Sequence, residues 1–279
     1  MQAVRHFLLA VQFFTRIPVT GRLADWVGYS PEMLRASAGH FPGVGWIVGL
    51  VAAGMYALWS LLLPAHNSFA PLVAALLSTT ATVLLTGCFH EDGLTDVIDG
   101  LGGSHERERA LDIMKDSRIG AYGSMAMVLA VGCKVALIAL LGSFSLHLAV
   151  ACLLCAHVIA RLWPMYVVRS LPHVGDTAQS KSKPLAEFIS TRGVITATLW
   201  ALPAAVLLGW WQGLAVLLPA VVLSAAAALW MRQWLNRRLQ GFTGDALGAI
   251  EQVSEIAFYL GAALSLGPLG QCLTTAVVV

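Results

Sequence analysis

The chain has 279 residues, of which 58% are hydrophobic and 11% are charged, and its mean hydropathy is +0.75. This balance excludes an ordinary soluble domain and predicts an integral membrane protein. The formal net charge of +2 is too small to indicate a nucleic-acid partner, so none is expected.

The first segment, residues 1–18, contains an apolar stretch from Phe7 to Phe14 between Arg5 and Arg16. The stretch is shorter than the ~20 residues that a transmembrane helix needs. No small-residue cleavage site of a signal peptide follows it. We therefore expect an interfacial or re-entrant helix on the cytoplasmic side, and an additional membrane crossing is the alternative.

Continuous apolar segments, each long enough to cross a ~30 Å hydrocarbon core, make up most of the remaining chain. The expected transmembrane helices are 41–63, 69–89, 120–142, 146–168, 193–211, 213–231 and 256–277. Their hydrophobicity is continuous rather than alternating, which argues against a β-barrel. The predicted fold is all-α: one integral membrane domain over 1–279, formed by a polytopic bundle of about seven transmembrane helices.

Charged residues gather in four parts of the chain, which are the N-terminal arm and residues 90–119, 169–192 and 232–255. The short links between the other predicted spans contain no Lys, Arg, Asp or Glu. The positive-inside rule places the four charged parts in the cytoplasm. We therefore expect a multi-pass protein of the cytoplasmic (inner) membrane whose active site faces the cytoplasm.

The segment 90–119 is the predicted cytoplasmic catalytic segment. Eight of the fifteen acidic residues of the chain lie in it: Glu91, Asp92, Asp96, Asp99, Glu106, Glu108, Asp112 and Asp116. On a helix, Asp92, Asp96 and Asp99 would lie within an arc of about 60°. Three like charges on one face repel one another unless a cation lies among them. Mg²⁺ is the natural candidate, because it binds one or two carboxylates together with waters and substrate phosphates.

Basic residues near this segment are candidates for phosphate binding. Lys115 and Arg118 precede a predicted span, where ordinary interfacial anchoring is the alternative. Arg161 lies in the cytoplasmic half of a predicted span, and its planar guanidinium suits a phosphate oxygen. An internal ion pair is the alternative for Arg161, and it is the favoured explanation of Lys134 in the middle of another span.

A third polar cluster begins at Gly244 and Asp245 and continues with Glu251 and Glu255, four residues apart. Asp245 or Glu255 could supply a further metal ligand or a general base. N-capping of a helix is the alternative for Asp245. The cluster alone does not indicate a particular reaction.

Three motifs together resemble the cobalamin synthase family, the adenosylcobinamide-GDP ribazoletransferases. The motifs are His90-x-Asp92-Gly93-x-x-Asp96-x-x-Asp99-Gly100, the run Ile113-Met114-Lys115-Asp116-Ser117-Arg118-Ile119-Gly120, and Gly244-Asp245-x-x-Gly248-Ala249. The start, Gln12 to Pro18, also resembles that family, and the similarity extends over the whole chain. Glu91 departs from the Leu associated with its position, so it is placed outside the ligand set.

The resemblance implies an Mg²⁺-dependent membrane enzyme of the last step of cobalamin biosynthesis. Such an enzyme joins adenosylcobinamide-GDP to α-ribazole, or to α-ribazole 5′-phosphate, and releases GMP. The metal ligands implied are Asp92, Asp96 and Asp99, and the phosphate-binding residues are Lys115, Arg118 and Arg161. The proton acceptor is His90, Asp116 or Asp245, and the sequence does not choose among them. The implied partners are these small-molecule substrates and the lipid bilayer, and a homo-oligomer is left open.

Other functional classes share parts of this pattern. CDP-alcohol phosphotransferases have a longer aspartate run with an Ala-Arg pair that is absent here. Membrane prenyltransferases need a second strong aspartate-rich helix, and residues 244–255 are too poor in aspartate for that. A cation transporter would carry acids in the middle of its spans, whereas we expect every acid at the cytoplasmic edge.

Overall fold

The structure is a computed structural model that describes residues 1–64, 66–175 and 188–268, and within these residues it has helices and no β-strand. The helices are α1 (Gln2–Phe14), α2 (Gly21–Val27), α3 (Pro31–Ser37), the 3₁₀ turn η1 (Ala38–His40), α4 (Phe41–Leu62), α5 (Ala70–Thr86), α6 (Phe89–Gly103), α7 (Arg107–Met114), α8 (Ala121–Phe144), α9 (Leu146–Ala160), α10 (Trp163–Ser170), α12 (Thr191–Gln212), α13 (Leu214–Leu239) and α14 (Gly244–Leu264). The all-α prediction is confirmed.

Five continuous helical stretches of the described chain are long and apolar enough to cross a membrane. They are 31–62, 121–144, 146–170, 191–212 and 214–239, and α5 with α6 makes a sixth if the two form one broken span. The protein is thus a polytopic membrane bundle. The predicted span 256–277 begins inside α14 and ends beyond the described residues, so the count of seven stays a prediction.

The break between α5 and α6 bends the chain by 89°. Gly87 and Cys88 both have positive φ, 69° and 62°, which ends α5 abruptly. A Cβ at Gly87 would collide with the side chain of Arg16, and the Arg16 amide donates a hydrogen bond of 2.7 Å to the Leu85 carbonyl. The N-terminal arm therefore packs into the bend, which directs α6 away from the line of α5.

The arm itself forms α1, which has 13 residues and is about 20 Å long. That length is too short for a membrane crossing. Leu9, Val11 and Phe14 are buried, and α1 packs against α3 and α4. This agrees with the helix expected over 1–18, although its position relative to the bilayer stays a prediction.

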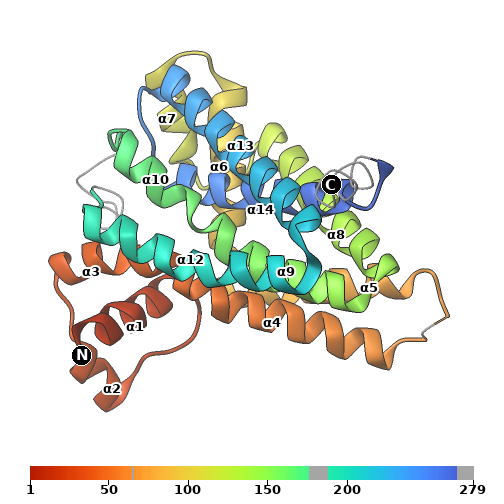
Figure 1. Ribbon diagram of the computed structural model, residues 1–279. Coiled ribbons are helices and arrows are strands. Elements are labelled where there is room, and N and C mark those ends of the chain that lie inside the picture. Colours follow the sequence, from red (N-terminus) through yellow and green to blue (C-terminus); the bar gives the residue numbers. More distant parts are fainter. Residues whose placement is uncertain (65, 176–187, 269–279) are drawn as a thin grey trace, which may run out of the picture.

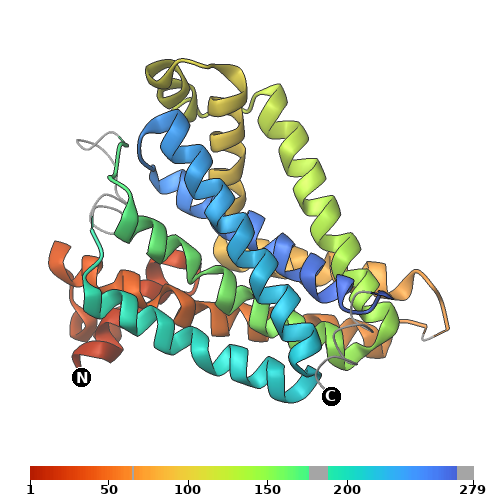
Figure 2. The ribbon, with the colours of Figure 1, turned by 45° about the horizontal axis from the view of Figure 1, so that its top comes forward.

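The helices form two groups that meet at α14. Figures 1 and 2 show α4, α9 and α12 running side by side, while α6, α7 and the neighbouring ends of α8 and α13 project from the other side of the molecule. Helix α14 contacts α6, α8, α9, α10 and α13. A Cβ at Gly261 would collide with the Pro219 carbonyl of α13, so glycine permits this close packing. Because α14 contacts both groups, its residues can contact polar motifs that lie far apart in the sequence.

Candidate active site

The acidic motif on α6 faces the start of α14. Asp92 is exposed, Asp96 is half-buried, and the negative charges of Asp245, Asp92 and Asp99 all act on the Asp96 carboxylate. The two helices touch closely, because a Cβ at Gly93 would lie 2.6 Å from the Asp245 carbonyl oxygen. Two of the sequence motifs, far apart in the chain, thus form one carboxylate cluster. We call Asp92, Asp96, Asp99 and Asp245 the acidic seam.

Asp99 has a structural partner within this seam. Its Oδ2 accepts a hydrogen bond of 2.7 Å from the Gly120 amide, and its Oδ1 accepts one of 2.8 Å from the Gly123 amide. A Cβ on either glycine would collide with the carboxylate, so these residues must lack a side chain. Asp99 therefore holds the start of α8 against α6. The sequence predicted Asp99 only as a metal ligand, and that role stays a prediction.

The aspartates of α6 do not form the tightest group of ligand atoms. Among the described residues, three His, Cys, Asp or Glu side chains place ligand atoms within 4.8 Å of one another, and these are His157, Glu251 and Glu255. Asp92, Asp96 and Asp99 are more widely spread. An Mg²⁺ ion requires only one or two carboxylates besides waters and phosphate oxygens, so the pair of Asp92 and Asp96 suits that donor chemistry.

Lys115, Asp116 and Arg118 lie in the turn between α7 and α8, next to Gly120 and its contact with Asp99. Lys115 and Arg118 are exposed. The Arg118 side chain donates to Asp116, with a shortest distance of 2.6 Å from Nη2 to Oδ2. These hydrogen bonds, together with one from the Arg118 amide, lower the pKa of Asp116 to about 2. Asp116 is therefore a weak proton acceptor at neutral pH.

Arg161 lies inside the protein, with 1% of its surface exposed. Its Nη1 is 2.7 Å from Glu251 Oε1 and donates a hydrogen bond of 2.9 Å to the His157 carbonyl. The guanidinium also lies over the Phe41 ring, 5.5 Å from its centroid. The structure therefore realises the internal ion pair that was the alternative, and phosphate binding by Arg161 stays a prediction.

The partners of Arg161 belong to a larger group of buried polar residues. We call this group the buried charge cluster, and it consists of Glu91, Lys134, His157, Arg161, Glu251, Gln252, Glu255 and Tyr259. Lys134 Nζ donates to Glu255 Oε2 at 2.8 Å, which confirms the internal pairing expected for this lysine. Gln252 Nε2 lies 3.0 Å from both Glu91 Oε1 and Glu251 Oε2.

The expectation that every acid lies at the cytoplasmic edge is therefore wrong. Glu251 and Glu255 are fully buried, and Glu255 pairs with Lys134 in the middle of α8. The physical reason is that α14 begins at Gly244 and carries both acids into the bundle. A signal was present in the sequence, since cations within apolar spans need partners and two acids four residues apart could supply them.

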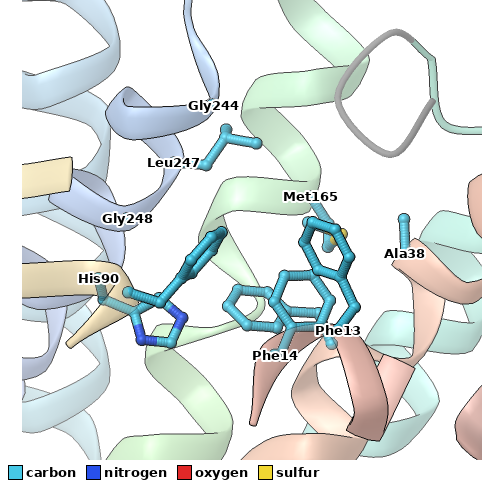
Figure 3. A pocket seen from close by; sticks show the side chains of 10 residues that line it. Phe13, Phe14, Ala38, His90, Met165, Gly244, Leu247 and Gly248 are labelled. Carbon is cyan, nitrogen blue, oxygen red and sulfur yellow. The ribbon is translucent and has the colours of Figure 1, made fainter. Parts of the chain in front are cut away.

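A pocket with mostly apolar walls lies where α6 and α14 begin. Its lining residues are Phe13, Phe14, Ala38, Phe41, Phe89, His90, Met165, Gly244, Leu247 and Gly248. Figure 3 shows His90 and Gly248 on one side of it, with Phe13, Phe14, Met165 and Ala38 on the other. His90 is buried, and among the described residues its Nε2 has no hydrogen-bond partner. The sequence had suggested His90 as a proton acceptor but gave no indication of this pocket.

Comparisons with known proteins identify the family of the chain. The family profile described as cobalamin-5-phosphate synthase matches residues 6–263. A relative from Albidiferax ferrireducens, named adenosylcobinamide-GDP ribazoletransferase, is 58% identical over 279 residues, covering 95% of this chain and 99% of its own. A protein with the same name from Polaromonas sp. is 59% identical over 278 residues, covering 95% and 98%.

More distant relatives carry the same name. The protein from Vibrio cholerae is 42% identical over 254 residues, which is 91% of each chain. No solved structure matches. The matched residues include the acidic seam, the turn before α8 and the start of α14. The chain therefore belongs to the cobalamin-5-phosphate synthase family.

Proposed function

We propose that this protein joins adenosylcobinamide-GDP to α-ribazole, or to α-ribazole 5′-phosphate, and releases GMP. A ribose hydroxyl attacks the phosphorus bonded to the cobinamide side, and the bond from that phosphorus to the oxygen bridging to GMP breaks. The family's description names a 5-phosphate product, in which the 5′ oxygen of the ribose already carries a phosphate. Another ribose hydroxyl is therefore the nucleophile. The observation that carries the proposal is the family match together with the acidic seam it contains.

Asp92 and Asp96 are the residues that would hold Mg²⁺ in this proposal. Their accessible, mutually repelling carboxylates suit a hard divalent cation. When bound, Mg²⁺ neutralises phosphate charge and stabilises the leaving group. Asp99 has both oxygens engaged by the start of α8, so its contribution is to fix α8 against the seam.

Lys115 and Arg118 would bind the pyrophosphate of the substrate. Both are exposed in the turn beside the seam, and a guanidinium suits two phosphate oxygens at once. Arg118 Nε and Nη2 already donate hydrogen bonds to the Asp116 carboxylate. A bound phosphate would take the place of that carboxylate. We leave Arg161 out of the phosphate-binding set, because its guanidinium pairs with Glu251.

Asp245 is the proton acceptor that we assign among the three predicted. Its charge acts on Asp96, so it lies beside the carboxylates that face the substrate. Asp116 is less suited because Arg118 keeps its pKa low. His90 lines the pocket with aromatic walls, and these surroundings favour a role in binding a ligand over a role as proton acceptor.

A cytoplasmic active site in the inner membrane is also part of the proposal. The basic end of α13 lies against the end of α6, since Arg238 Nη2 donates to the Leu101 carbonyl at 3.1 Å. Arg107 Nε donates in turn to the Leu239 carbonyl at 2.7 Å. Arg238, one of the arginines that the positive-inside rule assigns to the cytoplasm, thus lies against the helix that carries three aspartates of the seam, which supports this orientation.

The direct test is turnover by the purified full chain in lipid nanodiscs. We expect GMP release and corrinoid product formation, followed by liquid chromatography, only when adenosylcobinamide-GDP, the ribazole substrate and Mg²⁺ are all present. GMP release without the ribazole would indicate a hydrolase. Absence of any product under these conditions would defeat the proposal.

A further inference from the structure

The pocket at the start of α6 and α14 has walls suited to a flat aromatic ring. Phe14 and Phe41 lie 4.2 Å apart between ring centroids, and Phe13 and Phe89 lie 5.8 Å apart in an edge-on arrangement. The ring centroids of Phe41 and His90 lie 5.6 Å apart. The enclosed space between the walls is about 30 Å³, and the open mouth brings it to about 430 Å³, so a ring would lie in the mouth against these walls. We call it the aromatic pocket.

The chemistry of the walls restricts what kind of ring can enter. Among the described lining residues, His90 alone has a side chain with a strong hydrogen-bonding group, and its Nε2 is buried without a partner. A guanine ring would bring several donors and acceptors into this space, and each would lose its water without a partner. A benzimidazole ring, bonded to ribose through one nitrogen, has a single free ring nitrogen, which one imidazole can satisfy. Apolar walls with one polar group match that ring best.

The aromatic pocket is aligned with the acidic seam along α6. Phe89, Asp92 and Asp96 lie within about 60° of one another around the helix. With about 1.5 Å of rise per residue, Asp92 and Asp96 lie about 4.5 Å and 10.5 Å along the axis from Phe89. On α14, Gly244, next to Asp245, lines the same pocket. A nucleoside whose base contacts Phe89 would therefore extend its ribose toward the carboxylates.

We propose that the aromatic pocket binds the benzimidazole base of the ribazole substrate and orients its ribose hydroxyl toward Asp92, Asp96 and Asp245. This inference rests on the proposed function, since it assigns one of the two substrates to a place in the site. Phe89 and Leu247 become residues that determine specificity, and His90 becomes the hydrogen-bonding partner of the base. The guanosine end of the other substrate must then bind elsewhere.

The kinetic test is Leu247→Trp, which fills the pocket from α14. Its matched control is Leu260→Trp on the same helix, where the side chain is 42% exposed. We expect Leu247→Trp to raise KM for α-ribazole at least about tenfold, the effect of losing about 1.4 kcal/mol of binding. KM for adenosylcobinamide-GDP should stay within about twofold, as should both values for the control. An unchanged KM for α-ribazole, or a rise confined to adenosylcobinamide-GDP, would overturn the inference.

A binding experiment separates this inference from the proposed function. Radiolabelled α-ribazole is dialysed against the full chain in nanodiscs without the second substrate, with 5,6-dimethylbenzimidazole or guanine as competitor. We expect competition by dimethylbenzimidazole alone, and weaker binding to Leu247→Trp. If turnover fails but this pattern appears, the pocket assignment stands and the proposed reaction is wrong. If turnover succeeds and guanine competes, the pocket assignment is wrong.

A second substitution serves as the control for effects on folding. Phe89→Leu keeps an apolar side chain at a position that is 39% exposed, so the fold should tolerate it, but the ring-stacking contact is lost. We expect weaker α-ribazole binding with a normal melting temperature. Unchanged binding to Phe89→Leu would also count against the pocket.

Discussion

Asp92 and Asp96 have the same side chain as Asp99 but different surroundings. Asp92 is exposed and Asp96 half-buried, whereas Asp99 is buried and accepts two backbone hydrogen bonds. Replacing the first two with Asn removes a negative charge from a face where it has no cationic partner in the described structure. The effect on folding should therefore be small, and the effect on chemistry large.

The first prediction concerns Asp92→Asn and Asp96→Asn. Each should lower kcat at least about 100-fold, the scale of one lost electrostatic contact at a reacting centre. Melting temperatures should stay near that of the wild type. EDTA should abolish wild-type turnover and Mg²⁺ should restore it. Near-normal rates for both variants, or turnover in EDTA, would remove the metal assignment.

The second prediction concerns Asp99→Asn. An amide group offers one oxygen acceptor, so one of the Gly120 and Gly123 amides would lose its partner. The free energy of unfolding should fall by about 1–3 kcal/mol, which a melting-temperature series can measure. Asp92→Asn is the matched control on the same helix. Equal stability of the two variants would contradict the capping role of Asp99.

The third prediction concerns the ion pair of Arg161 and Glu251. Arg161→Ala leaves a fully buried carboxylate unpaired and should cost about 3–5 kcal/mol of stability. The double variant Arg161→Ala with Glu251→Gln should recover part of that loss, as a double-mutant cycle of melting measurements would reveal. If Arg161→Lys lost turnover while Arg161→Lys and Arg161→Ala both melted normally, phosphate binding by Arg161 would be favoured instead.

At the scale of helices, the contact between α6 and α14 sets the distance between the two halves of the acidic seam. Gly93 and Gly248 permit it, because a Cβ at either position would approach the backbone of the other helix, at 2.6 Å and 3.1 Å respectively. Separation of the helices by even a fraction of an ångström would move Asp245 away from Asp96. Catalysis should be more sensitive to this change than folding is.

The fourth prediction is that Gly93→Ala lowers kcat at least about tenfold, because the new methyl group must displace Asp245. Gly132→Ala on α8 is the matched control, since nothing lies within 4 Å of its added Cβ. The control should retain activity and gain up to about 1 kcal/mol of stability from helix propensity. Normal turnover by Gly93→Ala would indicate that the seam does not depend on this close contact.

The elements that hydropathy predicted well are those whose neighbours are lipid or apolar side chains. The expected span 41–63 corresponds to α4, Phe41–Leu62, and the expected span 193–211 to α12, Thr191–Gln212. Local composition is enough for such helices, because their burial does not depend on a particular partner.

Two features could not be read from local composition. The bend at Gly87 and Cys88 depends on Arg16, which is distant in the chain. The sequence predicted a span over 69–89 that ends near this point but did not predict the bend itself. The start of α14 was placed too late because Glu251 and Glu255 lower its hydropathy. Their charges are balanced by Lys134 and Arg161 from other helices, which no sequence window contains.

The candidate site was likewise predicted only in part. The acidic motif and the basic turn before α8 were identified because carboxylate spacing and basic residues are local signals, and their metal-binding and phosphate-binding roles stay predictions. The aromatic pocket was not found, because Phe13, Phe41, Phe89 and Leu247 come from four separate helices. Asp99 was assigned a single role for a similar reason, since its partner amides lie beyond the next helix.

For the whole molecule, the fifth prediction is that the ends of α6 and α13 share one side of the membrane. Arg238 joins them through its contacts with the carbonyls of Leu101 and Ser104. In a background without native cysteines, Ser104→Cys and Asn236→Cys, the latter at an exposed position near the end of α13, should react with an impermeant thiol reagent from the cytoplasm. Asn67→Cys, in the link between α4 and α5, should react from the opposite side. Labelling of all three from one side would overturn this topology.

The buried charge cluster also has a consequence for biosynthesis of the protein. Lys134 lies 121 residues before its partner Glu255, so at about 5–20 residues per second the lysine leaves the ribosome on the order of ten seconds before the glutamate. During that interval Lys134 and Arg161 lack their partners from α14, and each cation costs about 2.5–3.5 kcal/mol at the centre of a lipid-exposed helix, which favours retention by the insertion machinery. Release into the bilayer then depends on arrival of α14. A nascent chain ending before Glu251 should stay bound to the translocon or be degraded, whereas one ending after Tyr259 should be released.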